Sequence, residues 1–300
     1  VMVNRSALLF LAAVWLTLGC GSERESGVSQ QEEFRRRFSA ISPGTLPLSR
    51  LEVAVRDDSA DVEVNSDLAG VYASRGEHAR AIALYGEVLR RHPDYVRAHY
   101  NLGQVFFRIG KYDEAIEHFG RTVELVPEFA DGNLSLGAAY AQRAPAAAVG
   151  SPTKVIQADL DRAIDFCSRA VALDPQNAVY QYNLGRAHHL RNQFAEAAQA
   201  YVFALELDPA LVDAHRYLGE VYAKDGDWTK AEAEYRAAIR LDDENGEVHY
   251  ELGKSLERQR KNEEAVTAYQ LAIALKPGFA DAHYNLGKAL HRLGRLEESL

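Results

Sequence analysis

The sequence has little cysteine, and its charged residues form no strongly basic region. Two cysteines, Cys20 and Cys167, are too few for a disulfide framework or a cysteine-rich zinc site. The 34 lysines and arginines are outnumbered by 43 aspartates and glutamates, and the longest basic run is residues 35–37, all arginine. The charge pattern of a nucleic-acid-binding protein is therefore absent. The longest nearly uninterrupted apolar stretch, residues 7–18, is too short for a multi-span membrane protein.

Common enzyme motifs are missing as well. The sequence contains no Gly-x-Ser-x-Gly and no His-Glu-x-x-His segment, and no glycine-rich dinucleotide fingerprint follows a strand. Gly253, Lys254 and Ser255 resemble the end of a phosphate loop, but Val248 stands where that loop requires its first glycine. The sequence predicts no nucleotide site, no cofactor and no catalytic activity.

The N-terminal residues 1–19 are typical of a secretory signal, with Arg5 ahead of the apolar stretch. The following Thr17, Leu18, Gly19 and Cys20 resemble the lipobox of bacterial lipoproteins, in which cleavage precedes a cysteine that is acylated on its thiol. The resemblance implies lipidation at Cys20 and an exported protein anchored in the bacterial envelope, at the outer membrane on the periplasmic side in a two-membrane species. An ordinary cleaved signal, or an uncleaved anchor, is the alternative.

Residues 20–61 are polar and predict the lipid anchor and a linker. Two short helices are expected within this segment. One is a charged helix at 31–40, and the other is a capping helix at 48–57 whose apolar side covers the next element.

The rest of the chain repeats with a period of 34 residues. Five prolines lie 34, 48, 34 and 68 residues apart: Pro93, Pro127, Pro175, Pro209 and Pro277. Such self-similarity predicts a solenoid that spans residues 62–300. With each proline taken as position 32, the units are 62–95, 96–129, 130–177, 178–211, 212–245 and 246–279, with a partial seventh at 280–300.

Each unit has the apolar spacing of two helices. Leucine stands at position 7 of every unit, and glycine stands at position 8 of every unit but the first. Alanine stands at position 20 of the six full units, and most of these units have an aromatic residue at position 24. Small residues at positions 8 and 20 allow the two helices to approach closely. Because one pair cannot bury its apolar face alone, the pairs must stack.

The second unit shows the pattern in full, with Leu102, Gly103, Phe106, Gly110, Lys111, Tyr112, Ala115, Phe119 and Pro127. This arrangement resembles the tetratricopeptide repeat. The resemblance implies an all-α fold, a right-handed solenoid of antiparallel helix pairs with six full repeats and a truncated seventh. It further implies that the first helices line a concave groove that binds peptides or other proteins.

The third unit is longer than the others by 14 residues, with an insertion at about 144–157. Pro145 is expected to end its first helix, and Ser151 and Pro152 have the form of a helix start. A loop at 144–150 and a lengthened second helix from about 152 to 173 are therefore expected.

The histidines favour packing over metal binding. His99, His215, His249 and His283 all occupy position 4, so they are one packing position that recurs. They are also too far apart for a short-range zinc motif. Cys167 replaces an aromatic residue at position 24, which predicts a buried and unreactive thiol.

The family lines its groove with positions 2, 5, 6, 9, 12 and 13. Tyrosines and asparagines recur at positions 5 and 6, and positions 9, 12 and 13 carry more cations than anions. Two interpretations stay open: the common repeat consensus with cations near helix C-termini, or a groove for an extended peptide that bears carboxylates. The candidates are Tyr100, Asn101, Arg108, Tyr182, Asn183, Arg186, Tyr217, Lys224, Tyr250, Lys254, Arg258, Tyr284, Asn285, Lys288 and Arg292.

These patterns predict a membrane-anchored, non-catalytic scaffold for a protein or peptide partner, with an analogy to lipoproteins of envelope assembly. Two alternatives remain. Residues 62–300 would be the substrate-recruiting arm of a longer enzyme if the chain is cut at Leu300, which lies early in an expected helix. The repeats would instead serve self-association if their open end stacks on a second copy.

Overall fold

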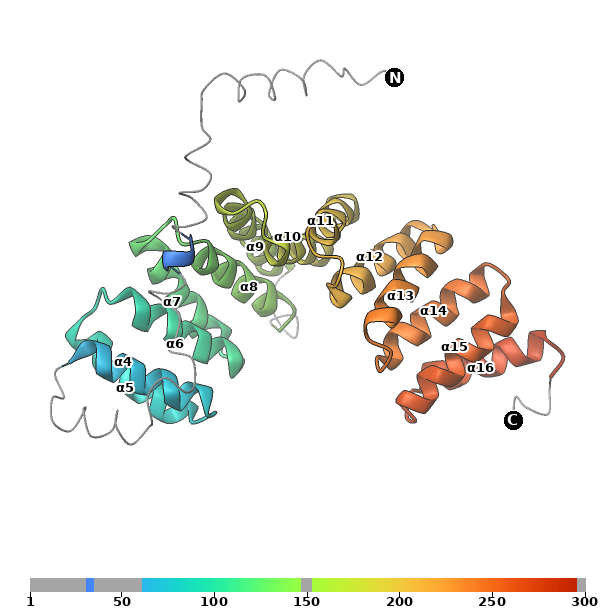
Figure 1. Cartoon of the computed structure of the whole chain (residues 1–300), viewed down its shortest axis with the longest axis horizontal. Coiled ribbons are helices and arrows are strands. Elements are labelled where there is room, and N and C mark those ends of the chain that lie inside the picture. The colour runs from blue at the N-terminus through green and yellow to red at the C-terminus, as the bar shows by residue number, and fades with distance from the viewer. Residues whose placement is uncertain (1–30, 35–60, 147–152, 296–300) are drawn as a thin grey trace, which may run out of the picture. The chain divides into compact units, whose positions relative to one another are not determined.

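The computed structural model describes residues 31–34, 61–146 and 153–295, and the regular structure of these residues is all α-helix (Figure 1). Residues 31–34, part of the charged helix expected at 31–40, are helical. Cys20, the signal at 1–19, most of the linker and the capping helix expected at 48–57 lie outside the described residues. The helices from residue 61 onward are α4 (Val62–Ser74), α5 (His78–Arg91), α6 (Val96–Arg108), α7 (Tyr112–Leu125), α8 (Ala130–Ala146), α9 (Thr153–Leu173), α10 (Ala178–Leu190), α11 (Phe194–Leu207), α12 (Val212–Asp225), α13 (Trp228–Leu241), α14 (Gly246–Arg258), α15 (Asn262–Leu275) and α16 (Ala280–Arg292).

The chain divides into two compact units, residues 1–101 and 102–300, with the boundary inside α6. In the first unit α4 packs against α5. In the second unit each helix packs against the one before it, and the closest partners are α8 with α9, α10 with α11, α12 with α13 and α14 with α15. The predicted all-α solenoid of consecutive antiparallel helix pairs is confirmed.

Close approach within each pair depends on the glycine at position 8. A Cβ atom built on Gly253 of α14 would lie 2.6 Å from the ring of Tyr269 on α15, and Tyr269 is fully buried. The same relation joins Gly185 to Tyr201, at 2.7 Å. Since carbon atoms in van der Waals contact are about 3.5–4.0 Å apart, only glycine allows these aromatic rings to pack against the first helix.

A left-handed residue ends the first helix of most repeats, at position 15 of the unit. Gly226 has a φ of 82° and caps α12. Two repeats place a side chain in this conformation, Asn192 with a φ of 64° and Arg260 with a φ of 63°. Asparagine tolerates the conformation, whereas an arginine there costs about 1–2 kcal/mol.

The histidines at position 4 have a hydrogen-bonding role that the sequence did not reveal. The Nε2 atom of His249 lies 3.0 Å from the carbonyl oxygen of Asp243, at position 32 of the preceding repeat. His99, His215 and His283 make the equivalent contact to Pro93, Pro209 and Pro277, at 2.8, 3.2 and 2.9 Å. Each bond satisfies a carbonyl group in the turn between repeats, which has no helical partner.

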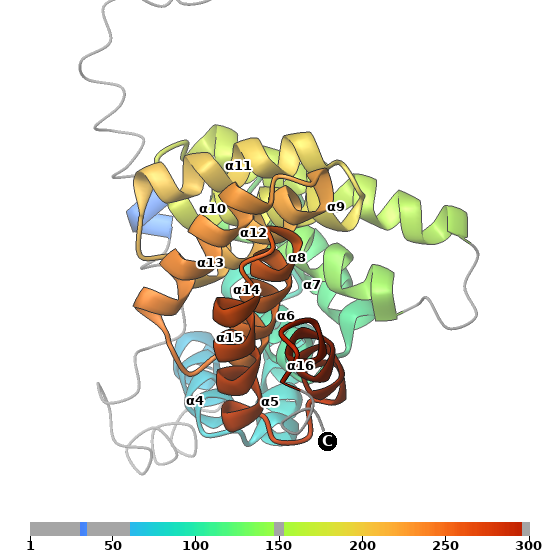
Figure 2. The ribbon, with the colours of Figure 1, turned by 90° about the vertical axis from the view of Figure 1, so that its right-hand side faces the viewer.

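The long second helix of the third repeat is found at Thr153–Leu173, close to the expected start and at the expected end. Figure 2 shows its extra length reaching past the ends of α10 and α11. The preceding α8 ends at Ala146, one residue after Pro145. Arg143 joins the two helices through paired hydrogen bonds of 2.8 and 2.6 Å to Asp159, whose side chain is 2% exposed.

Candidate functional site

In the second unit, the first helices of neighbouring repeats contact one another directly: α8 with α10, α10 with α12, α12 with α14 and α14 with α16. The groove candidates from Arg108 onward lie on first helices of this unit. Tyr100 and Asn101 belong to the first unit. Side chains on adjacent first helices can therefore line a common surface between repeats.

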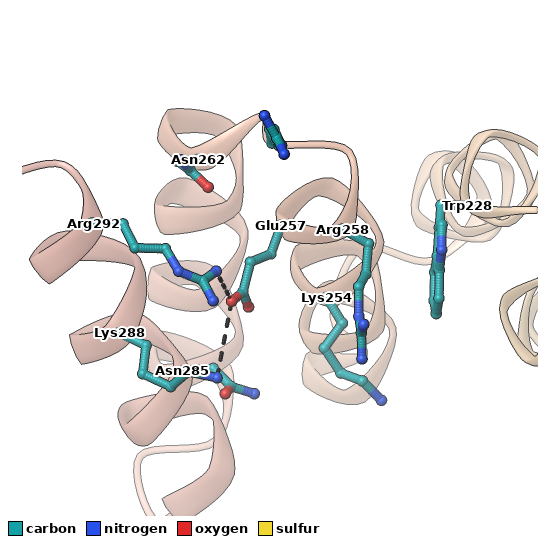
Figure 3. A pocket seen from close by; sticks show the side chains of 9 residues that line it. Trp228, Lys254, Glu257, Arg258, Asn262, Asn285, Lys288 and Arg292 are labelled. Carbon is teal, nitrogen blue, oxygen red and sulfur yellow. Dashed lines mark hydrogen bonds and ion pairs between the residues drawn. The ribbon is translucent and has the colours of Figure 1, made fainter. Parts of the chain in front are cut away.

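A cavity of about 710 Å³ lies where α14 faces α16 (Figure 3). Five cationic side chains and one carboxylate line it. Five of the sequence candidates meet here, Lys254 and Arg258 from α14 with Asn285, Lys288 and Arg292 from α16. The remaining lining residues are Trp228, Glu257, Arg260 and Asn262.

The carboxylate of Glu257 compensates part of the positive charge of the cavity. Its carboxylate accepts a hydrogen bond of 2.9 Å from the hydroxyl of Tyr269 and pairs with Arg292, and Lys288 lies 3.9 Å away. Figure 3 shows Arg292 and Lys288 reaching from α16 toward Glu257 on α14. Burial, and then the neighbouring Glu257 charge, raise the pKa of the Tyr269 hydroxyl, so it stays a donor at neutral pH.

The other cations are held differently. Lys254 pairs with Glu251 on its own helix, with Nζ 2.8 and 2.9 Å from the two carboxylate oxygens. The guanidinium carbon of Arg258 lies 5.3 Å from the ring centre of Trp228. Among the residues that the structure describes, neither Arg258 nor Arg260 has a carboxylate within ion-pair distance. Because these two guanidinium groups lack a counter-ion, they are the groups best placed to receive an anion.

Hydrogen bonds and an ion pair to residues of α13 hold the turn that carries Arg260 in place. The side-chain nitrogen of Gln259 donates to the carbonyl of Trp228 at 3.0 Å and to the buried carboxylate of Glu232 at 2.7 Å. Lys261 pairs with the same carboxylate at 2.7 Å. This edge of the cavity is thereby tied to α13.

Two tyrosines, Tyr250 and Tyr284, contact residues that line the cavity. The Asn285 amide donates a hydrogen bond of 3.1 Å to the hydroxyl of Tyr250, whose ring centre lies 4.7 Å from that of Phe279. Burial raises the pKa of Tyr250. Tyr284 is 70% exposed, and the ammonium of Lys288 lies 5.4 Å from its ring centre. The exposed aromatic face is available for stacking beside the cations.

A second group of candidates forms an aromatic cluster between α10 and α12. The rings of Tyr201 and Tyr217 are stacked at 5.9 Å, and Tyr182 lies 6.1 and 6.2 Å from them. The ring centre of His189 lies 5.7 Å from that of Tyr217. Burial, helped by the charges of Lys224 and Arg216, lowers the pKa of His189 to about 4, so this histidine is neutral at pH 7. This aromatic cluster is mainly apolar. The cavity between α14 and α16, which we call the basic cavity, is instead lined by five cations.

The remaining candidates lie outside both groups. Arg108 is exposed on α6, and the Lys224 ammonium lies 4.6 Å from the ring centre of Phe194. The amide of Asn183 donates 2.8 Å to the carbonyl of Val179 in its own helix, so a ligand backbone has to displace that bond. Arg186 is partly exposed on α10.

The groove positions do not predict Trp228, Arg260 and Asn262 as lining residues, because these three lie at the ends of helices or in the turn between them. Glu257 stands at position 12, a groove position, but its charge is opposite to that of most residues at positions 9, 12 and 13. One signal for Arg260 was present, since it replaces the glycine that other repeats carry at position 15. The rarity of tryptophan, with two in the chain, was a weaker signal for Trp228.

Comparisons with protein families identify the repeat. Models described as tetratricopeptide repeat match residues 66–128, 106–151 and 212–245, and one described as TPR repeat matches 185–226 and 259–294. Together these matches span more than half of the chain. The chain belongs to the tetratricopeptide repeat family.

Solved structures show the same fold. A MamA crystal structure has 23% identity and a TM-score of 0.50, covering 62% of this chain and 94% of that one. YrrB, described as a TPR protein with an unusual peptide-binding site, has 17% identity, a TM-score of 0.52 and coverages of 67% and 96%. A tetratricopeptide repeat protein from Parabacteroides merdae has 14% identity, a TM-score of 0.58 and coverages of 90% and 100%. A comparison with curated protein sequences found no match.

The fold and the family define the class of protein, a tetratricopeptide repeat scaffold that binds other proteins. Proteins of this class are usually non-catalytic. Within the described ranges, no helix has the length and apolar character needed to cross a membrane. In the same part of the chain, no group of histidine, cysteine, aspartate and glutamate is arranged to hold a metal ion.

Proposed function

We propose that this protein is a non-catalytic scaffold that binds an extended, carboxylate-bearing peptide across the first helices of residues 102–300, with the basic cavity as the main point of attachment. The observation that carries the proposal is the excess of cations there, five against one carboxylate, in a chain whose formal charge is −9. The cavity of about 710 Å³ falls within the size range of sites that enclose small ligands or a few side chains, about 300–1,000 Å³.

The conformation of Arg260 gives independent support. A left-handed arginine costs stability that a glycine would not, and four other repeats have glycine at this position. Residues in such conformations concentrate at functional sites, where the gain in binding offsets the cost in folding. Here the gain is a guanidinium group at the edge of the cavity.

The test is a charge reversal of the cavity in the full chain. A Lys254→Glu, Lys288→Glu, Arg292→Glu variant is expected to lose the partners that crosslinking in the native envelope recovers with the wild type. The reversal leaves two cations beside four carboxylates in the cavity, so the variant repels a peptide carboxylate and its affinity is expected to fall by at least about tenfold.

A matched control makes the same charge change elsewhere. Lys154, Arg169 and Arg240 are exposed on the second helices α9 and α13. Reversal of these three residues to glutamate is expected to leave the recovered partners unchanged. If the cavity variant keeps every partner of the wild type, the basic cavity is not the binding site.

We further propose that the scaffold is exported and anchored by lipid on Cys20, where it serves the assembly of envelope proteins. The support is the apolar stretch 7–18, which ends with Thr17 and Leu18 and is followed directly by Gly19 and Cys20. Each buried lipid methylene contributes about 0.8 kcal/mol, so several acyl chains make the attachment durable. Palmitate labelling is expected in the wild type and lost in Cys20→Ala, and labelling that persists in the variant would contradict the anchor.

A further inference from the structure

The carboxylate of Glu257 lies where an anionic ligand would bind. It lines the basic cavity, its side chain is 12% exposed, and it is bound by the Tyr269 hydroxyl and by Arg292, with Lys288 nearby. Two cations and one hydroxyl donor are the partners that a ligand carboxylate requires. A second carboxylate beside Arg292 and Lys288 therefore meets the negative charge of Glu257 and competes with it for the same two cations.

The cations of the cavity therefore form two sets. Arg292 and Lys288 are compensated by Glu257. Arg258 and Arg260 have no carboxylate partner in the part of the chain that the structure describes. The guanidinium carbon of Arg258 lies 5.3 Å from the ring centre of Trp228, a contact that uses no carboxylate and leaves the charge of Arg258 uncompensated.

We propose that Glu257 is an internal competitor for the ligand, which limits the site to segments of low charge density. The inference rests on the proposed function and deepens it. The first carboxylate of a bound peptide pairs with Arg258 and Arg260. A second carboxylate competes with Glu257 for Arg292 and Lys288 and is repelled by its charge, so little affinity is gained.

The test compares two labelled probes on the full chain by fluorescence anisotropy at low salt. Both are end-blocked glycine–serine peptides of about ten residues, one with a single glutamate and one with three consecutive glutamates. The wild type is expected to bind the two probes with similar affinity. In Glu257→Gln, affinity for the triple-glutamate probe is expected to rise about five- to tenfold, and affinity for the single-glutamate probe less than about twofold.

Two further variants separate competition from a general change in charge. Glu247→Gln removes one negative charge from the same helix, but Glu247 pairs with Lys276, which does not line the cavity. It is expected to affect both probes equally. Tyr269→Phe keeps every charge and removes the hydroxyl that holds Glu257, so it is expected to favour the triple-glutamate probe in the same direction by a smaller factor.

Circular dichroism and thermal unfolding confirm that each variant is folded, and Tyr269→Phe decides the question if Glu257→Gln does not fold. An equal rise for both probes in Glu257→Gln, matched by Glu247→Gln, overturns the competitor role and leaves the proposed function intact. If the wild type binds neither probe and charge reversal of the cavity has no effect on native partners, the proposed function fails, and the competitor role fails with it.

Discussion

Replacing Gly253 by alanine tests the packing principle of the repeat, because two opposing effects have known sizes. In an exposed helix interior, alanine is more favourable than glycine by about 1 kcal/mol. At position 253 the new Cβ atom would lie 2.6, 2.7 and 3.1 Å from three ring atoms of Tyr269. The helices or the ring must therefore separate by about 1 Å to reach a normal contact.

Tyr269 has little freedom to move. Its side chain is fully buried, and its hydroxyl is bonded to Glu257. Overpacking of a buried site costs about 1–3 kcal/mol. The clash therefore cancels or exceeds the gain in helix propensity, and Gly253→Ala is expected to leave the free energy of unfolding unchanged or to lower it by up to about 2 kcal/mol.

Gly120 is the matched control, since it lies inside α7 and a Cβ atom there meets nothing within 4 Å. Gly120→Ala is expected to stabilise the protein by about 0.5–1 kcal/mol. Denaturant unfolding followed by circular dichroism measures both variants, compared by midpoint because repeat arrays need not unfold in two states. A Gly253→Ala midpoint raised as much as that of Gly120→Ala would refute the packing argument.

Three other substitutions give direct outcomes. His249→Leu removes the ring nitrogen that bonds the turn before α14 and leaves a carbonyl without its partner, so chemical denaturation is expected to show a loss of about 1–3 kcal/mol. The hydrogen bond that His215 donates to the carboxylate of Glu234 raises the pKa of His215 above its ordinary 6.5. The resulting stabilisation is complete below about pH 6 and is lost as pH rises through the folded-state pKa, so the loss of stability in His215→Phe should be larger at about pH 5.5 than at about pH 9. Arg260→Gly relieves a left-handed residue and is expected to stabilise by about 1 kcal/mol while it weakens binding of the triple-glutamate probe, and a loss of stability would contradict the strain.

The fold is predictable from the sequence because its packing rule recurs every 34 residues. Leu252 and Gly253 have counterparts in the other repeats, so the period, the helix pairs and the small contact positions are visible without a structure. The position-4 histidines were recognised as one recurring position for the same reason. Their bond to the carbonyl at position 32 was missed because it depends on the geometry of a turn, which apolar spacing does not encode.

The candidate site was only partly predictable, because the state of a charge depends on contacts between repeats. Lys254 and Arg258 lie on one helix, yet Lys254 pairs with Glu251 on that helix while Arg258 stacks on Trp228 of the preceding repeat. Sequence position alone makes these two cations equivalent. Their different partners distinguish them.

The same reasoning explains how a recurring scaffold acquires one specific site. The buried aromatic residue at position 24 packs against the glycine at position 8 in four repeats of the second unit, and its role there is structural. In the sixth repeat the hydroxyl of Tyr269 also holds Glu257, which compensates Arg292 and Lys288. Tyr269 thus serves in helix packing and, through one hydrogen bond to Glu257, also influences how far the cations of the cavity are compensated. Changes at Gly253 that displace this ring should therefore alter peptide binding as well as stability, whereas Gly120→Ala should alter stability alone.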